Sequence, residues 1–154
     1  MFGRQRKTHK WGITPPLSGC LPTEEEREQT RQMQHFLKNK AGVYENREEM
    51  ALRRQILCDM YAVACQWVES KTGARNKCCL FTFGSYRLGV GGPGADIDAL
   101  VVTPQAISRE QFFDDWEKIL LDRKEYVSKA VLVRESFVPV IKLVWRNVDI
   151  DLLF

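Results

Sequence analysis

The stretch CLFTFGSYRLGVGGPGADIDALVV, residues 79–102, decides the fold of this chain. Two apolar runs, Cys79–Phe83 and Ile97–Val102, flank a glycine-rich connection. Aromatic and β-branched residues at this run length are typical of short strands. The stretch therefore predicts two strands, the first ending at Gly84, joined by a flexible connection.

Two carboxylates lie at the start of the second predicted strand. Asp96 and Asp98 are two residues apart, so on a strand they project from one face while Ile97 points into the core. Like charges held this close repel each other, and burying them unpaired is costly. A divalent cation removes the conflict, and an oxygen-only ligand set suits Mg²⁺ or Mn²⁺. The pair therefore predicts a metal site.

A second acidic pair lies in the last predicted strand, Val148–Phe154. Asp149 and Asp151 again share one face of that strand. Three or four carboxylates from two strands can hold two metal ions about 4 Å apart, an arrangement that serves phosphoryl transfer. The spacing alone leaves the choice between Asp149 and Asp151 open.

The turn after the first strand is a candidate phosphate-binding element. Gly84 allows close approach of a phosphate to the backbone, and the Ser85 hydroxyl and nearby N–H groups can bind phosphate oxygens. Arg87 is a further candidate, although it could equally brace the loop. The glycines of residues 89–94 match G-x-G-x-x-G, but a proline interrupts them and a strand follows, which excludes a dinucleotide-binding fingerprint. We interpret them as a connection that brings Asp96 back beside Ser85.

The rest of the chain supplies helices and further strands. Capping-box spacing predicts three helix starts, and alternating apolar residues predict three more strands, the last two joined by a tight turn at Arg146-Asn147. The helices expected are Thr23–Lys38, Asn46–Lys71 and Ser108–Leu121, and the strands are Val127–Arg134, Val138–Trp145 and Val148–Phe154. This order predicts an α/β (α+β) fold with a mixed sheet of about five strands flanked by helices.

The apolar pattern, cysteine content and net charge indicate the expected core, the redox compartment and the kind of partner. The apolar stripe expected to pack the second helix comprises Leu52, Ile56, Met60, Val63 and Trp67. Five cysteines without a C-x-x-C pair indicate free buried thiols in a reducing compartment. A net charge of +3 permits a polyanionic partner without requiring one. The sequence has no run of about 18 apolar residues, so we expect no membrane-spanning helix.

At these residues the sequence resembles a known family. The string FTFGSYRLGV…GADIDAL, Phe81–Leu100, closely resembles eukaryotic poly(A) polymerases, within the polymerase-β-type nucleotidyltransferase superfamily. Three flanking segments agree: WGITPPLS at Trp11–Ser18, FVPVIKLVW at Phe137–Trp145 and DIDLLF at Asp149–Phe154. The resemblance spans nearly the whole chain but only the N-terminal part of that family.

The resemblance implies roles for individual residues. Asp96, Asp98 and Asp151 are implied as catalytic metal ligands for two Mg²⁺ or Mn²⁺ ions, with Asp149 beside them. Gly92 stands where the family commonly has a threonine, so only a backbone contact with the nucleotide is implied there. The full set implied to contact ATP or metal is Phe83, Gly84, Ser85, Gly92, Asp96, Ile97, Asp98 and Asp151.

The implied function is template-independent transfer of AMP from ATP to RNA 3′ ends, with release of pyrophosphate, in nuclear mRNA polyadenylation. The implied partners are ATP, the RNA 3′ end and proteins of the 3′-end processing complex, without a membrane, and we expect a monomer. Two alternatives stay open: a uridylyl- or CCA-adding enzyme of the same superfamily, and a non-catalytic module that binds RNA or a protein partner.

The sequence also suggests a division of the chain. We expect an extended arm over residues 1–22, with a weak basic cluster at Arg4, Arg6, Lys7 and Lys10, and a catalytic domain over residues 23–154. The helical and RNA-binding domains of the family have no counterpart in these residues, and the sequence ends within an apolar strand. We therefore expect a truncated domain that has little polyadenylation activity by itself.

Overall fold

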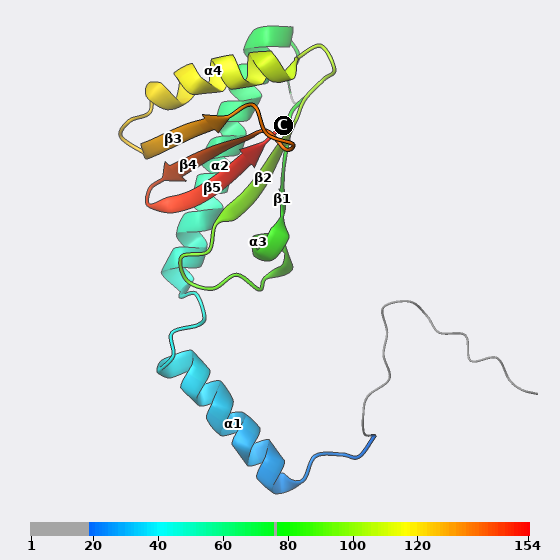
Figure 1. Cartoon of the computed structure of the whole chain (residues 1–154), viewed down its shortest axis with the longest axis vertical. Coiled ribbons are helices and arrows are strands. Elements are labelled where there is room, and N and C mark those ends of the chain that lie inside the picture. The colour runs from blue at the N-terminus through cyan, green and yellow to red at the C-terminus, as the bar shows by residue number, and fades with distance from the viewer. Residues whose placement is uncertain (1–18, 76) are drawn as a thin grey trace, which may run out of the picture.

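The computed structural model describes residues 19–75 and 77–154 (Figure 1). Most of the predicted arm, including the basic cluster and the segment Trp11–Ser18, lies outside the described residues. Within the described part, no helix has the length and apolar content that a bilayer crossing needs.

Three helices begin at the capping boxes that the sequence predicts. They are α1 (Glu24–Asn39), α2 (Arg47–Thr72) and α4 (Arg109–Leu121). At the start of α2, the Glu49 amide donates to Asn46 Oδ1 at 2.8 Å, and the Asn46 amide donates to Glu49 Oε2 at 3.0 Å. These reciprocal bonds satisfy amides that a helix start leaves unpaired, and so fix where the helix begins.

Five strands form one mixed sheet, as predicted. They are β1 (Cys79–Phe83), β2 (Ile97–Val102), β3 (Val127–Val133), β4 (Val140–Trp145) and β5 (Val148–Leu153). Their order is β1-β2-β5-β4-β3, in which β2 and β5 are parallel and the other neighbours are antiparallel. The order places β2 beside β5, although 45 residues separate the end of one from the start of the other along the chain.

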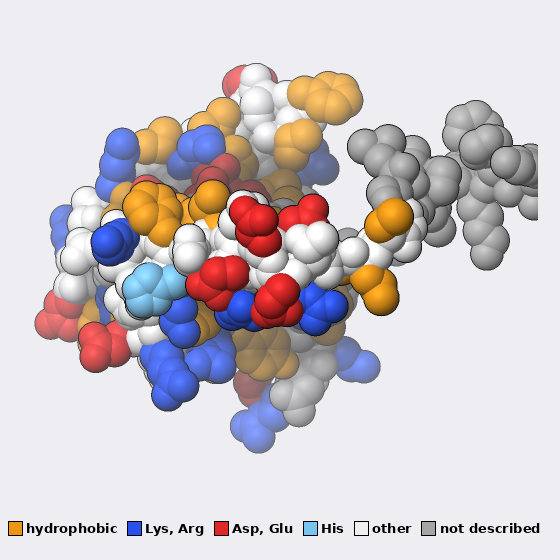
Figure 2. All heavy atoms as spheres, turned by 90° about the horizontal axis from the view of Figure 1, so that it is seen from below, with side chains coloured by type: hydrophobic (Ala, Val, Ile, Leu, Met, Phe, Trp, Pro, Cys, Tyr) orange, Lys and Arg blue, Asp and Glu red, His pale blue; other side chains and the backbone are white. Residues whose placement is uncertain are grey.

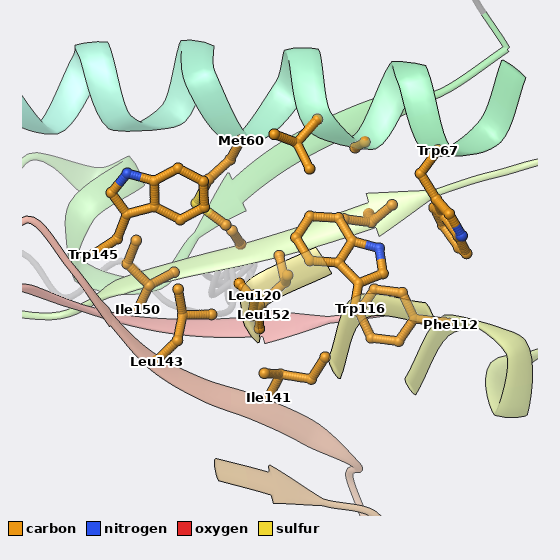
Figure 3. Close-up of a cluster of buried hydrophobic side chains, with 14 of the residues drawn as sticks. Met60, Trp67, Phe112, Trp116, Leu120, Ile141, Leu143, Trp145, Ile150 and Leu152 are labelled. Atoms are coloured by element: carbon orange, nitrogen blue, oxygen red, sulfur yellow. The ribbon is translucent and has the colours of Figure 1, made fainter. Parts of the chain in front are cut away.

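The hydrophobic core lies between one face of the sheet and the helices α2 and α4 (Figure 3). Alternate residues of β4 and β5 point into it, among them Leu143 and Leu152, which are at most 2% exposed. Trp67 of α2 meets Trp116 of α4 edge-on, with ring centroids 6.2 Å apart. Because strand residues alternate between faces, the polar residues between these apolar ones lie on the opposite face of the sheet.

The predicted apolar stripe of α2 is wrong at one position. Ile56, Met60 and Trp67 are buried, but Leu52 is 37% exposed and its neighbour Arg53 is only 4% exposed. The first turns of α2 face a polar loop rather than the sheet, so that a buried guanidinium is favoured there over an apolar side chain. Helical periodicity identifies a face of a helix but not what lies opposite each turn of it.

A short helix, α3 (Gly84–Leu88), was not predicted. Its five residues follow β1 directly, where the sequence suggests a Gly-Ser turn, and it ends at Gly89 with a φ of +68°. A helix of this length is too short to show a periodic apolar pattern, and isolated helices so short are unstable. Its contacts with β1 and β2 stabilise it instead.

The prediction of buried thiols is correct for Cys78 only. Cys20, Cys58 and Cys79 are exposed and Cys65 is half-buried, and no disulfide links the cysteines. Burial follows position here: Cys58 lies off the apolar stripe of α2, and Cys79 points to the side of β1 away from the core.

The helix α1 extends away from the sheet and its helices (Figure 1), and none of its residues is buried. Seen from that end of the molecule, acidic and basic side chains are interspersed along α1, beside a few hydrophobic ones (Figure 2). Arg31 pairs with Glu24 and Glu28 at 3.1 and 2.8 Å. The helix therefore relies on its own cap and charge pairs more than on packing.

Candidate active site

Two neighbouring strands bring three carboxylates together. In the parallel pairing of β2 with β5, Asp98 lies directly opposite Asp151, and Asp96 lies just before β2. One oxygen from each of these three side chains lies within 4.8 Å of the others. Asp96, Asp98 and Asp151, the carboxylate triad, thus share the face of the sheet opposite the core.

Asp149 lies on the same face but outside the triad. It is exposed at the start of β5, opposite Val144 of β4. With Asp96 and Asp151 it borders a cavity of about 700 Å³. The structure therefore separates the two members of the second acidic pair, which the spacing alone could not do.

Burial and neighbouring charges raise the pKa of Asp98, the central member of the triad. Partial burial is the main cause of the raised pKa of Asp98, and the negative charges of Asp96 and Asp151 add to it. Lys142 acts in the opposite direction. Burial disfavours the ionised Asp98 by removing water from it, and the two neighbouring carboxylates disfavour it by repulsion.

Lys142 of β4 is a member of the site that sequence reasoning missed. It lies opposite Asp151 in the sheet, and its Nζ donates to Asp151 Oδ2 at 2.7 Å. That hydrogen bond raises the pKa of Lys142. A lysine between the apolar residues of β4 was the available signal, because a charged side chain in such a strand must point away from the core.

The predicted turn residues lie beside the triad. Phe83 is opposite Asp98 in the sheet, and Gly84 follows with a φ of +62°. A Cβ at Gly84 would overlap Asp98 Oδ2 and would lie 3.1 Å from Asp98 Cγ. Only glycine combines this backbone conformation with so close an approach.

The start of the glycine-rich loop lies beside Ser85, whereas the expected position of Asp96 next to Ser85 stays a prediction. The Val90 amide donates to the Ser85 carbonyl at 3.1 Å, and a Cβ at Gly91 would lie 3.7 Å from Ser85 Oγ. Gly92 packs toward the segment before α2, where its Cβ would lie 3.3 Å from the Val43 carbonyl oxygen.

Two other candidates point elsewhere. The Ile97 side chain is fully buried in the core, so that only its backbone faces the triad. Arg87 borders a groove with Tyr61 of α2 and Phe81 of β1, and none of the triad lines that groove. The structure therefore places Arg87 at a groove apart from the triad, which does not support the phosphate contact that the sequence left open.

The donor set fits divalent cations. Three carboxylates, of which Asp98 is partly buried, are offset by the single lysine Lys142 and leave an excess of negative charge. Their ligand atoms are all oxygens. Hard divalent cations such as Mg²⁺ and Mn²⁺ prefer such ligands. Asp96, Asp98 and Asp151 are the residues of the described chain that could hold them.

Comparison with known proteins assigns the family. Residues 12–154 match the model of the poly(A) polymerase nucleotidyltransferase domain. The chain belongs to this family. A poly(A) polymerase of Schizosaccharomyces pombe is 38% identical, and the match covers 96% of this chain and 27% of that protein. Nuclear poly(A) polymerase 2 of Arabidopsis thaliana is 35% identical, and the match covers 94% of this chain and 19% of that protein. This poly(A) polymerase domain therefore spans about a quarter of the first relative and about a fifth of the second.

Solved structures agree with the nucleotidyltransferase fold. The polymerase core of TRAMP, an RNA surveillance complex, has a TM-score of 0.56 and is 25% identical, over 81% of this chain and 36% of that one. A Cid1 poly(U) polymerase solved with MgATP has a TM-score of 0.63 at 16% identity, over 83% of this chain and 38% of its own. At this identity, the similarity to Cid1 shows only that the two chains share a fold.

Proposed function

We propose that this domain transfers AMP from ATP to RNA 3′ ends without a template, releasing pyrophosphate, in nuclear mRNA polyadenylation. The observation that carries the proposal is the carboxylate triad, assembled from β2 and β5 in a chain of the poly(A) polymerase family. All three aspartates are present, which favours a catalytic domain over a purely binding module.

In this proposal each part of the site has one task. Asp96, Asp98 and Asp151 hold two divalent cations, Mg²⁺ or Mn²⁺, through oxygen atoms. The bound cations supply positive charge for the attacking and leaving oxygens of the transfer. Ser85 and the amides after Gly84 orient the triphosphate of ATP, and Phe83, exposed beside Asp98, contacts the nucleotide. The protein thus contributes position and fixed charge rather than covalent chemistry.

The proposed partners are ATP, the RNA 3′ end and proteins of the 3′-end processing complex. Two Arabidopsis relatives, 34% and 35% identical, are named nuclear poly(A) polymerases, which supports a nuclear location. The chain spans 27% or less of these relatives. We propose that nucleotide selection and RNA binding in such proteins rest on the rest of their length, so that the 154 residues alone extend an oligo(A) primer poorly.

The proposal predicts that the triad binds Mn²⁺. Electron paramagnetic resonance or calorimetry on the 154-residue chain should detect Mn²⁺ binding that Asp98→Ala abolishes, because a central ligand is lost. Asp149→Ala should weaken binding less than Asp151→Ala, since the Asp149 carboxylate lies outside the triad. Asp114→Ala, on the exposed side of α4, is the control for loss of a surface carboxylate. Equal binding by wild type and Asp98→Ala would refute the metal site.

A uridylyl- or CCA-adding activity is the alternative within the same fold. Sequence identities of 34–38% to poly(A) polymerases favour transfer of AMP. Incorporation of each of the four nucleotides by the 154-residue chain, and by any longer form of it, would decide. Preference for UTP or CTP would replace the proposed substrate while leaving the metal site intact.

A further inference from the structure

We propose that the Arg53–Glu45 pair is a positioning pair that fixes the backbone before Asp96 and so sets the metal affinity of the triad. The proposal rests on the proposed function, because it assigns these two residues a part in holding the metal ligand Asp96 in place. Neither residue touches the triad in the described contacts, and both act through the Ala95 backbone.

Asp96 needs support that the sheet does not provide. The backbones of Asp98 and Asp151 lie opposite each other within the pairing of β2 with β5, but that pairing begins at Ile97. Asp96 therefore lies at the end of a loop that contains four glycines between residues 89 and 94. Such a loop has many accessible backbone conformations, so a ligand at its end is poorly held unless other contacts restrict it.

Arg53 makes that contact from α2. Its Nη2 donates a hydrogen bond to the carbonyl oxygen of Ala95, the residue that precedes Asp96. Within the loop, the Ala95 amide donates to the Gly92 carbonyl at 3.1 Å. Ala95 is thus held on both sides, by the loop through its amide and by α2 through its carbonyl.

Glu45 holds the guanidinium in place. Arg53 Nε lies 2.7 Å from Glu45 Oε1, and the two side chains are 5% and 16% exposed. Arg53 is the one charged residue that is buried among the described residues. A buried charge is costly and is tolerated only with a partner and further hydrogen bonds. Both are present, and the further hydrogen bond reaches the loop that carries Asp96.

The segment before α2 and the first turns of α2 also lie close to the glycine-rich loop at other points. The segment before α2 approaches Gly92, and Tyr44, Glu45 and Arg53 border a cavity of about 430 Å³ together with Ala95 and Asp96. The pair therefore lies at the contact between the start of α2 and the glycine-rich loop. It connects residues 42 positions apart in the sequence.

Arginine suits this task better than lysine. The planar guanidinium presents Nε to Glu45 and Nη2 to Ala95 at the same time, in a fixed geometry. A lysine offers one nitrogen on a flexible stem. It can keep either the ion pair with Glu45 or the hydrogen bond to the Ala95 carbonyl, but it cannot hold both in a fixed geometry. Arg53→Lys thus removes the positioning while it keeps the charge.

The test measures Mn²⁺ affinity and thermal unfolding on the 154-residue chain. We expect Arg53→Lys to bind Mn²⁺ about tenfold more weakly, the lower end of what outer-shell changes cost metal sites. The double variant Glu45→Met with Arg53→Met removes both charges, keeps the net charge unchanged and avoids an unpaired buried ion, so it should remain folded. We expect the same loss of affinity from it.

Controls separate positioning from general stability. Arg134→Lys alters an arginine that pairs with Asp114 and Glu117 of α4, away from the loop, and should bind Mn²⁺ like the wild type. Wild-type affinity in the folded double variant would overturn the positioning role and leave the metal site standing. Failure of the wild type itself to bind Mn²⁺ would refute the proposed function, and the positioning role with it. Should Arg53→Lys unfold, the double variant alone decides.

Discussion

Gly84 shows how much a single residue can determine in this fold. Its φ of +62° turns the chain from β1 into α3, and its missing side chain leaves room for the Asp98 carboxylate. Two separate constraints, one on the backbone and one on space, therefore act at the same residue. The first depends only on local conformation, whereas the second exists only because β2 pairs with β1.

Replacing Gly84 with alanine should separate these constraints. Gly84→Ala should lose Mn²⁺ affinity and thermal stability, because its Cβ must displace the Asp98 carboxylate. Gly73→Ala is the matched control: its φ is +65° and no atom lies within 4 Å of the added Cβ. The control should lose only about 1–2 kcal/mol of stability through left-handed strain, with unchanged Mn²⁺ affinity. Equal effects of both variants on Mn²⁺ binding would contradict the steric argument.

The hairpin of β4 and β5 sets the position of Asp151 at the scale of elements. Arg146 and Asn147 both have positive φ, 48° and 64°, which is typical of a two-residue hairpin turn. The turn fixes the register in which Lys142 faces Asp151. A slip of one residue would move Asp151 to the core face, so the geometry of the site depends on this turn.

Substitutions at Asn147 should test the turn. Asn147→Val should destabilise the domain by about 1–2 kcal/mol, because a β-branched residue tolerates positive φ poorly, whereas Asn147→Gly should be neutral or slightly stabilising. The side chain is exposed, so little packing is lost in either variant. Urea unfolding at pH 7 measures the difference. If valine and glycine gave the same midpoint, the turn would not be what holds the register.

At the scale of the molecule, Asp115 of α4 links the two helices that cover the sheet. Trp67 Nε1 of α2 donates to Asp115 Oδ2 at 2.9 Å, and Lys71 Nζ lies 2.7 Å from the same oxygen. Partial burial works to raise the pKa of Asp115, but the hydrogen bonds from Lys71 and Trp67 outweigh it and hold that pKa below its usual value. The folded state therefore favours the ionised carboxylate.

This lowered pKa predicts how stability depends on pH. The unfolded chain binds the proton first, near its ordinary pKa of about 3.9. The contribution of Asp115 is then present above that pH and is lost as the pH falls through the lower pKa of the folded state. Asp115→Asn should be less stable than the wild type at pH 7, by an amount that shrinks toward pH 3 in urea unfolding. A difference that stays constant with pH would contradict this. Asp114→Asn, on the exposed side of α4, should cost less than about 1 kcal/mol at pH 7.

Local chemistry made much of this protein predictable from its sequence. Capping boxes fixed three helix starts, alternation fixed the strands, and the Asp-x-Asp spacing placed two carboxylates on one face, because each signal depends on neighbours within a few residues. The short helix α3 and the buried Arg53 could not be predicted in this way. The helix α3 is too short for a periodic pattern and depends on its contacts with β1 and β2. Arg53 depends on Ala95, which lies 42 residues further along the chain.

The sequence by itself determined the helices and strands of the described chain other than α3, the mixed character of the sheet and the candidate ligands. Spacing left the choice between Asp149 and Asp151 open, and the family resemblance implied Asp151. Only the tertiary structure decided how Asp151 joins Asp96 and Asp98, and that Arg53 reaches the loop before Asp96. The β4–β5 hairpin adds Lys142, which lies nine residues from Asp151 in the sequence. The physical reason is the strand order. Placing β5 beside β2, and α2 against the glycine-rich loop, brings together groups that 40 or more residues separate, and no local pattern records such pairing.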